Sequence, residues 1–418
     1  MKSKKLKKWT TLLTCATALT VMTACSQSSS QSTGTSTSSK TSAVTATTSK
    51  KTNKNNSNYF TSKDSDTSYN ESSATKIKLS GSSADVSGDG AVLSGSTVTI
   101  SKAGTYVISG KSDGVQIKVD AGDSDDVHIV LDGVTMTNTN AAINATKAGH
   151  VYLTLKDGTT NTLSDSSSNS DQDADAVIFS KGDLTINGSG TLNIDAKKNN
   201  GIKANDSLHM TGGTYKISSV GDAFNVNDEL NITGTTMTIE AEEDAVKVDN
   251  DDDTSAGTMY LSDNTMTIKA GDDGIHASGD MIIDSGTYMV EKSTEGIEGK
   301  SVTINGGNID VYATDDGVNA ANSNASQSEI FFKMTGGTLN VEVGQGDTDP
   351  IDSNGDIIVS GGTINLTGQS GFDFDGSATY TGGDITINGE KQTKIENSMP
   401  GGGGPQGGGQ PGGFGGGH

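Results

Sequence analysis

The chain contains 418 residues with a formal net charge of −23, and it has no arginine. This charge excludes a nucleic-acid-binding protein, because phosphate contacts need a basic surface. A chain this acidic is expected to bind cations, and it would need a cation as a bridge to hold a polyanion.

Residues 1–24 have the features of a secretory signal peptide, since lysines precede an apolar stretch. The sequence from Met22 to Cys25 resembles a bacterial lipobox, with Met22 in place of the usual leucine. This resemblance implies lipidation of Cys25 and a lipid-anchored protein on the extracellular face of the cell membrane. The alternative is an ordinary secreted protein with a stray cysteine. The other cysteine, Cys15, lies within the signal, so no disulfide is expected.

Three further segments differ in composition from the remainder. Residues 25–73 are rich in Ser, Thr, Lys and Asn, and they have too few apolar residues to offset the entropy of ordering. We therefore predict a disordered linker there. Residues 74–172 follow the repeat described below only loosely, which predicts β-rich coils or a cap. Residues 396–418, nearly all Gly with Pro and Gln, predict a disordered tail.

Residues 173–395 carry a repeat of about 22 residues. Every copy opens with an acidic or amide residue, then a small residue, then an aliphatic or aromatic one. The copies open at Asp175, Asn200, Asp222, Asp244, Asp273, Glu295, Asp316 and Asp349. A ninth copy opens at Ser370 and breaks the acidic series.

The rest of each copy contains alternating strands separated by turns such as Gly336-Gly337-Thr338. One unit therefore indicates three short strands. Because a single coil cannot bury its apolar side, we predict an all-β, right-handed parallel β-helix with a continuous core. A β-sandwich or barrel would explain the strands but not the register of the repeat. Two longer gaps, residues 249–257 and 321–329, predict loops on one face, often the binding face.

The acidic residues that open the copies would stack in one column, because neighbouring coils lie about 4.8 Å apart. Like charges placed directly opposite one another destabilise a sheet, so a cation must neutralise the column or its pKa values must rise. Calcium suits carboxylate and amide oxygens, whereas a chain without useful cysteines is a poor candidate for zinc or copper.

The candidate calcium ligands belong to the column, precede it by one residue or follow it by three. They are Asp222, Asn225, Glu243, Asp244, Asp272, Asp273, Glu295, Glu298, Asp315, Asp316, Asn319, Asp349, Asp352 and Asp373. The alternative is that these residues are turn formers at the corners of the β-helix, where Asx side chains bond the backbone.

Other motifs are weaker. The spacing of aspartates after Val248 imitates an EF-hand, but Thr254 and Tyr260 stand where glycine and glutamate are required. The nine-residue period of RTX calcium repeats is absent. The only tryptophan, Trp9, lies in the signal. Most remaining aromatic residues are expected in the core rather than on a sugar-binding platform, including Tyr152, Tyr215, Tyr260, Tyr288, Tyr312 and Phe372.

The stretches from Asp272 to Ala277 and from Asp315 to Ala320, the Gly-Gly-Thr turns and the Gly/Pro tail carry a resemblance. They resemble a bacterial family of extracellular calcium-binding, carbohydrate-binding β-helix proteins with an architecture related to pectate lyases. The resemblance covers about residues 75–395. It implies a lipid-anchored surface protein that binds a plant-type polysaccharide, such as cellulose or polygalacturonate, with structural calcium.

Enzymatic activity is not expected. A lyase needs a base, and without arginine Lys247 is the candidate, but nearby carboxylates favour its charged form. The favoured function is therefore a monomeric, calcium-binding, carbohydrate-binding protein. The alternatives are a calcium-dependent polysaccharide lyase, and a non-enzymatic β-helix adhesin or wall-associated structural protein.

Overall fold

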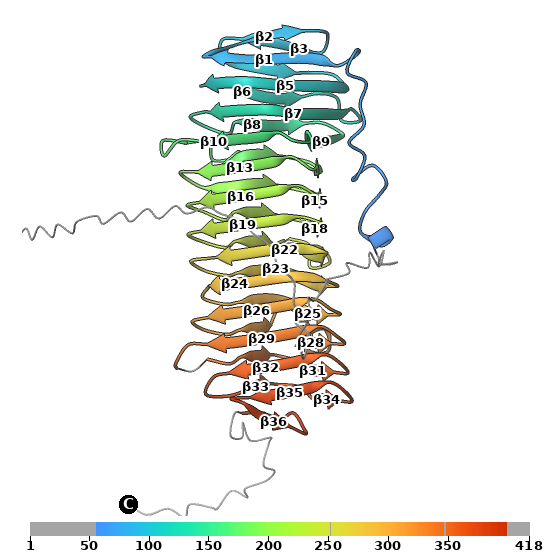
Figure 1. Cartoon of the computed structure of the whole chain (residues 1–418), viewed down its shortest axis with the longest axis vertical. Helices are drawn as coiled ribbons and strands as arrows, with labels where there is room; N and C mark the ends of the chain where they lie inside the picture. Colours follow the sequence, from blue (N-terminus) through green and yellow to red (C-terminus); the bar gives the residue numbers. More distant parts are fainter. Residues whose placement is uncertain (1–55, 251, 347, 399–418) are drawn as a thin grey trace, which may run out of the picture. The chain divides into compact units, whose positions relative to one another are not determined.

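The computed structural model describes residues 56–250, 252–346 and 348–398. These residues form a parallel β-helix whose coils stack along one axis (Figure 1). Each coil of the repeat region contributes a strand to three stacks, which confirms the predicted solenoid with three short strands per coil. No helix among the described residues is long and apolar enough to cross a membrane.

We name the three stacks sheet 1, sheet 2 and sheet 3. Sheet 1 contains β4 (Thr97–Ile100), β6 (Gln116–Asp120), β8 (Ile143–Lys147), β11 (Ala176–Ser180), β14 (Asn200–Ala204), β17 (Phe224–Val226), β20 (Val246–Val248), β23 (Ile275–Ile283), β25 (Ile297–Ile304), β27 (Val318–Ala320), β30 (Ile351–Ser353) and β33 (Phe372–Phe374).

Sheet 2 contains β1 (Thr75–Gly81), β5 (Gly104–Asp113), β7 (Asp126–Thr137), β9 (His150–Leu155), β12 (Leu184–Gly188), β15 (Ser207–Thr211), β18 (Glu229–Thr233), β21 (Thr258–Ser262), the second halves of β23 and β25, β28 (Phe331–Met334), β31 (Asp356–Val359) and β34 (Ala378–Tyr380).

Sheet 3 continues from the ends of β5 and β7. It contains β10 (Thr160–Ser164), β13 (Thr191–Ala196), β16 (Thr214–Ser219), β19 (Thr236–Ala241), β22 (Asn264–Lys269), β24 (Gly286–Lys292), β26 (Asn308–Ala313), β29 (Thr338–Val343), β32 (Thr363–Thr367) and β35 (Asp384–Ile387).

Both ends of the β-helix are closed by antiparallel pairs. At the N-terminal end β2 (Ser83–Ser87) pairs with β1, and β3 (Ala91–Ser94) pairs with β4. At the C-terminal end β36 (Glu390–Gln392) pairs with β35. These hairpins cover the outer edges of β1, β4 and β35, which would otherwise be free to recruit another chain. Residues 74–172, expected as coils or a cap, therefore begin with the hairpins and continue the same stacks.

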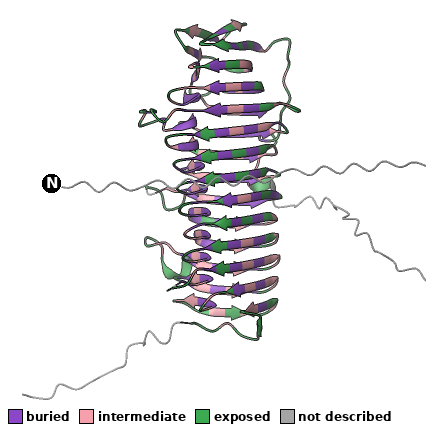
Figure 2. Ribbon diagram, turned by 60° about the vertical axis from the view of Figure 1, so that its left-hand side comes forward, coloured by how far each residue is buried: buried purple, intermediate pink, exposed green. Residues whose placement is uncertain are grey.

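The core follows from the alternation of side chains along each strand. In β16 and β19 every second residue is buried, and Figure 2 shows this alternation repeated along the β-helix. Ile202, Phe224 and Val246 lie in register on successive coils and are all buried. Each such side chain contributes roughly 1.5–3 kcal/mol by leaving water, so the stacked rows hold the coils together.

The backbone conformation of the Gly-Gly-Thr turns explains why they contain glycine. The second glycine of two such turns, Gly337 and Gly362, has a φ of 84° and 88°. Residues with a side chain rarely adopt this conformation. Glycine is therefore needed just before these sheet 3 strands. This explains why the Gly-Gly-Thr turn recurs in the sequence, once in each of several coils.

A segment that we name the strap, residues 56–73, lies along the outer face of sheet 2. It begins with the 3₁₀ turn η1 (Asn56–Asn58). The Tyr59 ring stacks on Tyr260 with ring centroids 3.7 Å apart, and the buried Asp64 carboxylate accepts a hydrogen bond of 2.7 Å from Thr185. The prediction of a disordered linker through residue 73 is therefore wrong for the strap.

The strap is also held by charge. The Asp64 carboxylate lies 3.3 Å from Nδ1 of His209, and Lys63 forms an ion pair of 2.9 Å with Asp126. Burial acts to lower the pKa of His209, but Asp64 and Glu229 raise it to about 9. A protonated His209 therefore joins the strap to sheet 2 at neutral pH.

Most of the predictions for the two ends of the chain concern residues outside those that the structure describes. The signal peptide, Cys25 and linker residues 25–55 lie outside the described residues, as do tail residues 399–418. The tail was predicted to begin at residue 396, but Asn397 donates a hydrogen bond of 2.6 Å to the Phe374 carbonyl, and the Ser398 amide donates one of 2.8 Å to the Phe372 carbonyl. Residues 396–398 therefore still belong to the folded body.

Candidate functional site

Seven of the residues that open the copies stack at the corner before sheet 1 and form what we name the corner column. Its members are Asn200, Asp222, Asp244, Asp273, Glu295, Asp316 and Asp349. The residues three positions after the openings lie in register on successive strands of sheet 1. They form a second row that we name the strand column. Its members are Lys203, Asn225, Lys247, His276, Glu298, Asn319, Asp352 and Asp373.

One side-chain oxygen of several corner residues binds the backbone of the next coil. Oδ1 of Asn200, Asp222 and Asp244 accepts hydrogen bonds of 2.9, 3.0 and 2.9 Å from the amide that follows 22, 22 and 29 residues later. Asp316 accepts one of 2.7 Å from the Asp349 amide. The corner residues thus serve as turn formers, and the step of 29 residues contains the first insertion.

The second oxygen faces the strand column. Asp222 Oδ2 accepts a hydrogen bond of 2.5 Å from Asn225, and Asp244 Oδ2 accepts one of 2.8 Å from Lys247. The residues three positions after the corner therefore point the same way as the corner residues. Candidate calcium ligands from both columns therefore lie side by side.

The middle of the two columns contains its own cations. Burial acts to lower the pKa of Lys247, but the hydrogen bond and the charge of Asp244 raise it above its ordinary value. Nδ1 of His276 lies 3.2 Å from Asp273 Oδ2 and 2.6 Å from Glu298 Oε2. Burial opposes the charge of His276, but these two carboxylates raise its pKa to about 10. Both side chains are therefore positively charged at neutral pH.

The C-terminal part of the columns is different. Burial, followed by the charge of Glu298, raises the pKa of Glu295 to about 8. Burial, then the charges of Asp316 and Asp373, raises the pKa of Asp352 to about 7. Asp316 is raised to about 6, again by burial and neighbouring carboxylates. The charged groups that raise these pKa values are all acidic.

The other predicted ligands occupy the turn before the corner. Glu243, Asp272 and Asp315 are exposed there. The ligand atoms of Asp272 lie within 4.8 Å of those of Asp244 and Asp273, as close as a metal site requires. The atoms of Asp273, His276 and Glu298 form a second such group, whose mixed nitrogen and oxygen donors suit zinc better than calcium.

Both insertion loops line one hollow beside the strand column. Asn250 and Asn322 come from the two loops, and both bond Ser278, at 3.0 and 2.8 Å. The hollow has a volume of about 220 Å³, and His276 and Glu298 lie in its wall. The prediction that the insertions lie on one face therefore agrees with the structure.

The family model for carbohydrate-binding domain-containing proteins matches residues 94–349 and 274–401. The chain belongs to this family. A relative with the same description from Acetivibrio thermocellus is 37% identical over 137 residues, which cover 31% of this chain and 48% of the relative. The chain thus matches about half of that relative's length.

One solved structure is also similar to this chain. It is described as the polysaccharide lyase-like protein from C. thermocellum, gadolinium derivative, and it is 25% identical. The match covers 76% of this chain and 95% of that chain, with a TM-score of 0.33.

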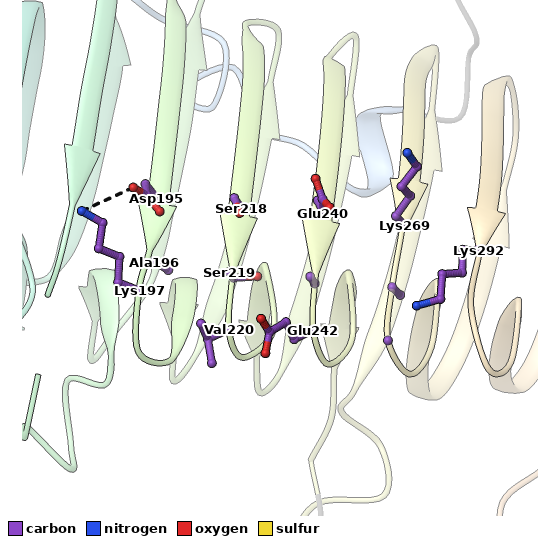
Figure 3. Close-up of a pocket in the computed structure, with 13 residues that line it drawn as sticks. Asp195, Ala196, Lys197, Ser218, Ser219, Val220, Glu240, Glu242, Lys269 and Lys292 are labelled. Atoms are coloured by element: carbon purple, nitrogen blue, oxygen red, sulfur yellow. Dashed lines mark ion pairs between the residues drawn. The ribbon is translucent and has the colours of Figure 1, made fainter. Parts of the chain in front are cut away.

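A groove of about 540 Å³ between sheet 3 and the following corner was missed by the sequence reasoning. Figure 3 shows Asp195, Ser218, Glu240 and Lys269 in a row on successive strands. The groove carries acidic and basic side chains together; Lys197, for example, pairs with Asp195 at 3.6 Å. Its charges compensate one another, unlike those at the C-terminal end of the columns.

The expectation that the aromatic residues lie in the core is correct for Tyr215, Tyr288 and Phe372. Tyr260 is buried, but under the strap rather than in the core. Tyr312 is 39% exposed, so the expectation was wrong for it. The alternation of β26 could have found this, because buried Val311 and Ala313 flank Tyr312.

Proposed function

We propose that this protein is a non-enzymatic, calcium-binding protein that recognises a polysaccharide of the cellulose or polygalacturonate type. Its family membership and the two columns support the carbohydrate and calcium parts of the proposal. The lipobox-like sequence supports anchorage at the extracellular face of the cell membrane through Cys25. The anchored protein is proposed to be a monomer.

The observation that carries the calcium proposal is that the corner hydrogen bond does not need a charge. Asn200 Oδ1 accepts its bond from the next coil at 2.9 Å, as Asp222 and Asp244 do at 3.0 and 2.9 Å. An amide would therefore hold the coils together equally well. The acidic members of the corner column carry a repulsion that the turn itself does not require.

A bound cation removes this repulsion. Asp316, Asp352 and Asp373 supply only oxygen donors, the type that calcium prefers, and the charge of Asp373 adds to burial in raising the pKa values of Asp316 and Asp352. We assign the calcium site to this part of the columns, with Glu295 and Asp349 as neighbouring donors. Lys247 and His276 already compensate the middle coils, where calcium is less needed.

Calcium would also allow an acidic protein to bind an acidic glycan, because the ion can share its ligands between the protein and a uronate carboxylate. The hollow between the insertion loops offers amide and hydroxyl groups beside the columns, including Asn250, Asn322 and Ser278. Such groups bond sugar hydroxyls. The polysaccharide is therefore proposed to lie along the columns with the hollow beside it.

The lyase alternative requires a neutral Lys247. Its ammonium group instead forms an ion pair of 2.8 Å with Asp244, which favours the charged form. This observation supports a binding protein over an enzyme that uses this lysine as its base.

The test is electrophoresis through native gels that contain polygalacturonate, with calcium or with chelator. We expect retardation of the purified protein only with calcium, and its loss in the double variant D352N/D373N. The control variant D85N removes an exposed charge from the N-terminal hairpin. Equal mobility of the wild type in every gel would reject calcium-bridged binding and favour the adhesin alternative or a neutral glycan.

A further inference from the structure

A second surface with the chemistry of a carbohydrate site lies on the outer face of sheet 3, on strands β24, β26, β29 and β32. Met289 and Tyr312 are 41% and 39% exposed there, although large apolar side chains are otherwise mostly buried among the described residues. Two hollows of about 470 and 430 Å³ share Tyr312, Glu342 and Thr367 in their walls. We name this region the Tyr312 surface.

Polar groups beside the ring are held in fixed positions. Asp310, Asn340 and Asn365 lie in register on three successive strands. Asn365 Nδ2 donates a hydrogen bond of 2.7 Å to Asn340 Oδ1, and Asn340 Nδ2 donates one of 2.7 Å to Asp310 Oδ1. A side-chain amide has two N–H donors and an oxygen with two lone pairs, so this ladder leaves bonding capacity toward a ligand.

The neighbouring row continues the same pattern. Tyr312, Glu342 and Thr367 lie in register on β26, β29 and β32, and all three are exposed. An aromatic ring therefore stands at one end of a row of acceptors and hydroxyls, parallel to the amide ladder. Aromatic side chains bury much apolar area at a low entropic cost, and a few fixed polar groups supply orientation.

Charge decides which glycan fits. Among the described residues that line the two hollows, none is basic, while Asp310 and Glu342 are acidic. A uronate would meet repulsion here, and no cluster of carboxylates comparable to the corner column is present in these walls to hold a bridging cation. The groove in Figure 3 differs, because Lys197, Lys269 and Lys292 contribute to it.

We propose that the Tyr312 surface binds a neutral polysaccharide chain without calcium, with the Tyr312 ring against the apolar face of a sugar and the amide ladder bonding its hydroxyls. This inference rests on the proposed function, since it assigns a second, separate site to a carbohydrate-binding protein. The neutral glycan would bind on sheet 3, and the acidic glycan at the columns of sheet 1.

The experiment uses native gels that contain hydroxyethyl cellulose or polygalacturonate, each with calcium or chelator. The variants are Y312A, Y312F, which keeps the ring, and the control V92A, which removes apolar surface from an exposed site in the N-terminal hairpin. We expect Y312A to weaken binding to hydroxyethyl cellulose at least tenfold with or without chelator, and Y312F and V92A to bind as the wild type does. Binding of Y312A to polygalacturonate should be unchanged.

Several results would overturn the inference. The first is equal binding of Y312A and the wild type to hydroxyethyl cellulose, and the second is wild-type binding that chelator abolishes. Retardation by polygalacturonate alone would overturn the inference and leave the proposed function standing, whereas retardation by neither glycan would reject both. A change in sedimentation of Y312A would instead assign the surface to contact with a second copy. Unchanged thermal unfolding of Y312A excludes misfolding as the cause of lost binding.

Discussion

Replacement of Asp352 by asparagine should stabilise the calcium-free protein near pH 8. The raised pKa means that the native state holds this proton more tightly than the unfolded chain. The stability from this group is therefore fully present below about pH 4 and is lost as pH rises through about 7. A rise from 3.8 to about 7 corresponds to at most about 4 kcal/mol, and solvent screening of this half-buried group reduces the cost to about 2 kcal/mol.

Asparagine has nearly the same size and no charge, so D352N avoids this cost. In chelator near pH 8, we expect its free energy of unfolding to exceed that of the wild type by about 2 kcal/mol, and near pH 4 the two should agree. With calcium the order should reverse, because only the wild type keeps the full set of donors.

The assay is urea unfolding followed by circular dichroism, with the thermal midpoint as a second readout. D85N serves as the control for a change of one charge and should follow the wild type at every pH. A lower stability of D352N in chelator near pH 8 would refute the reasoning, since it would mean that the ionised carboxylate stabilises the calcium-free coil. An equal response of both proteins to calcium would remove Asp352 from the site.

Three more predictions test the fold. D64A should lower the free energy of unfolding by about 3 kcal/mol, because it removes the buried acceptor that anchors the strap. Urea unfolding measures this change. An unchanged free energy of unfolding would show that the strap does not stabilise the protein. G274A should cost about 1–3 kcal/mol, because its Cβ would lie 2.6 Å from the Gly296 carbonyl oxygen, whereas G182A, whose Cβ meets its nearest atom at 3.6 Å, should unfold like the wild type. Asp222→Asn should retain the corner hydrogen bond and be about 1 kcal/mol more stable than Asp222→Ala in thermal unfolding; equal midpoints would contradict the role of this bond.

The solenoid could be predicted because its determinants repeat along the chain. The acidic, small and apolar residues at each corner place Phe224, Val246 and Ile275 in one buried row, and the alternation that follows specifies the strands. The period also located the two insertions. All of these signals depend on residues within one coil and its immediate neighbours.

The strap could not be predicted in this way. Its composition, averaged over the linker, is that of a disordered chain, but its docking depends on a few side chains that find partners far along the sequence. Asp64 reaches Thr185 across 121 residues, and Tyr59 stacks on Tyr260. Thr185 and Tyr260 come to lie on one face only when sheet 2 has folded. The pairing of His276 with Asp273 and Glu298 could not be predicted for a similar reason, since it depends on which oxygen of each carboxylate remains for a side chain. The charged form of Lys247 beside acidic residues, by contrast, was expected from the sequence.

The strand column changes its charge along the axis of the β-helix, and this change bears on how one acidic glycan could be held. Lys247 and His276 are positively charged, while Asp352 and Asp373, further along the same column, are acidic. In the middle coils these cations are already paired with carboxylates, so a uronate chain lying along the column would meet compensated charge there and acidic groups beyond Glu298. Under the proposed function calcium therefore does more than strengthen binding. It turns the acidic C-terminal coils from a repulsive surface into one that can share an ion with uronate carboxylates, so that binding of the acidic glycan requires calcium.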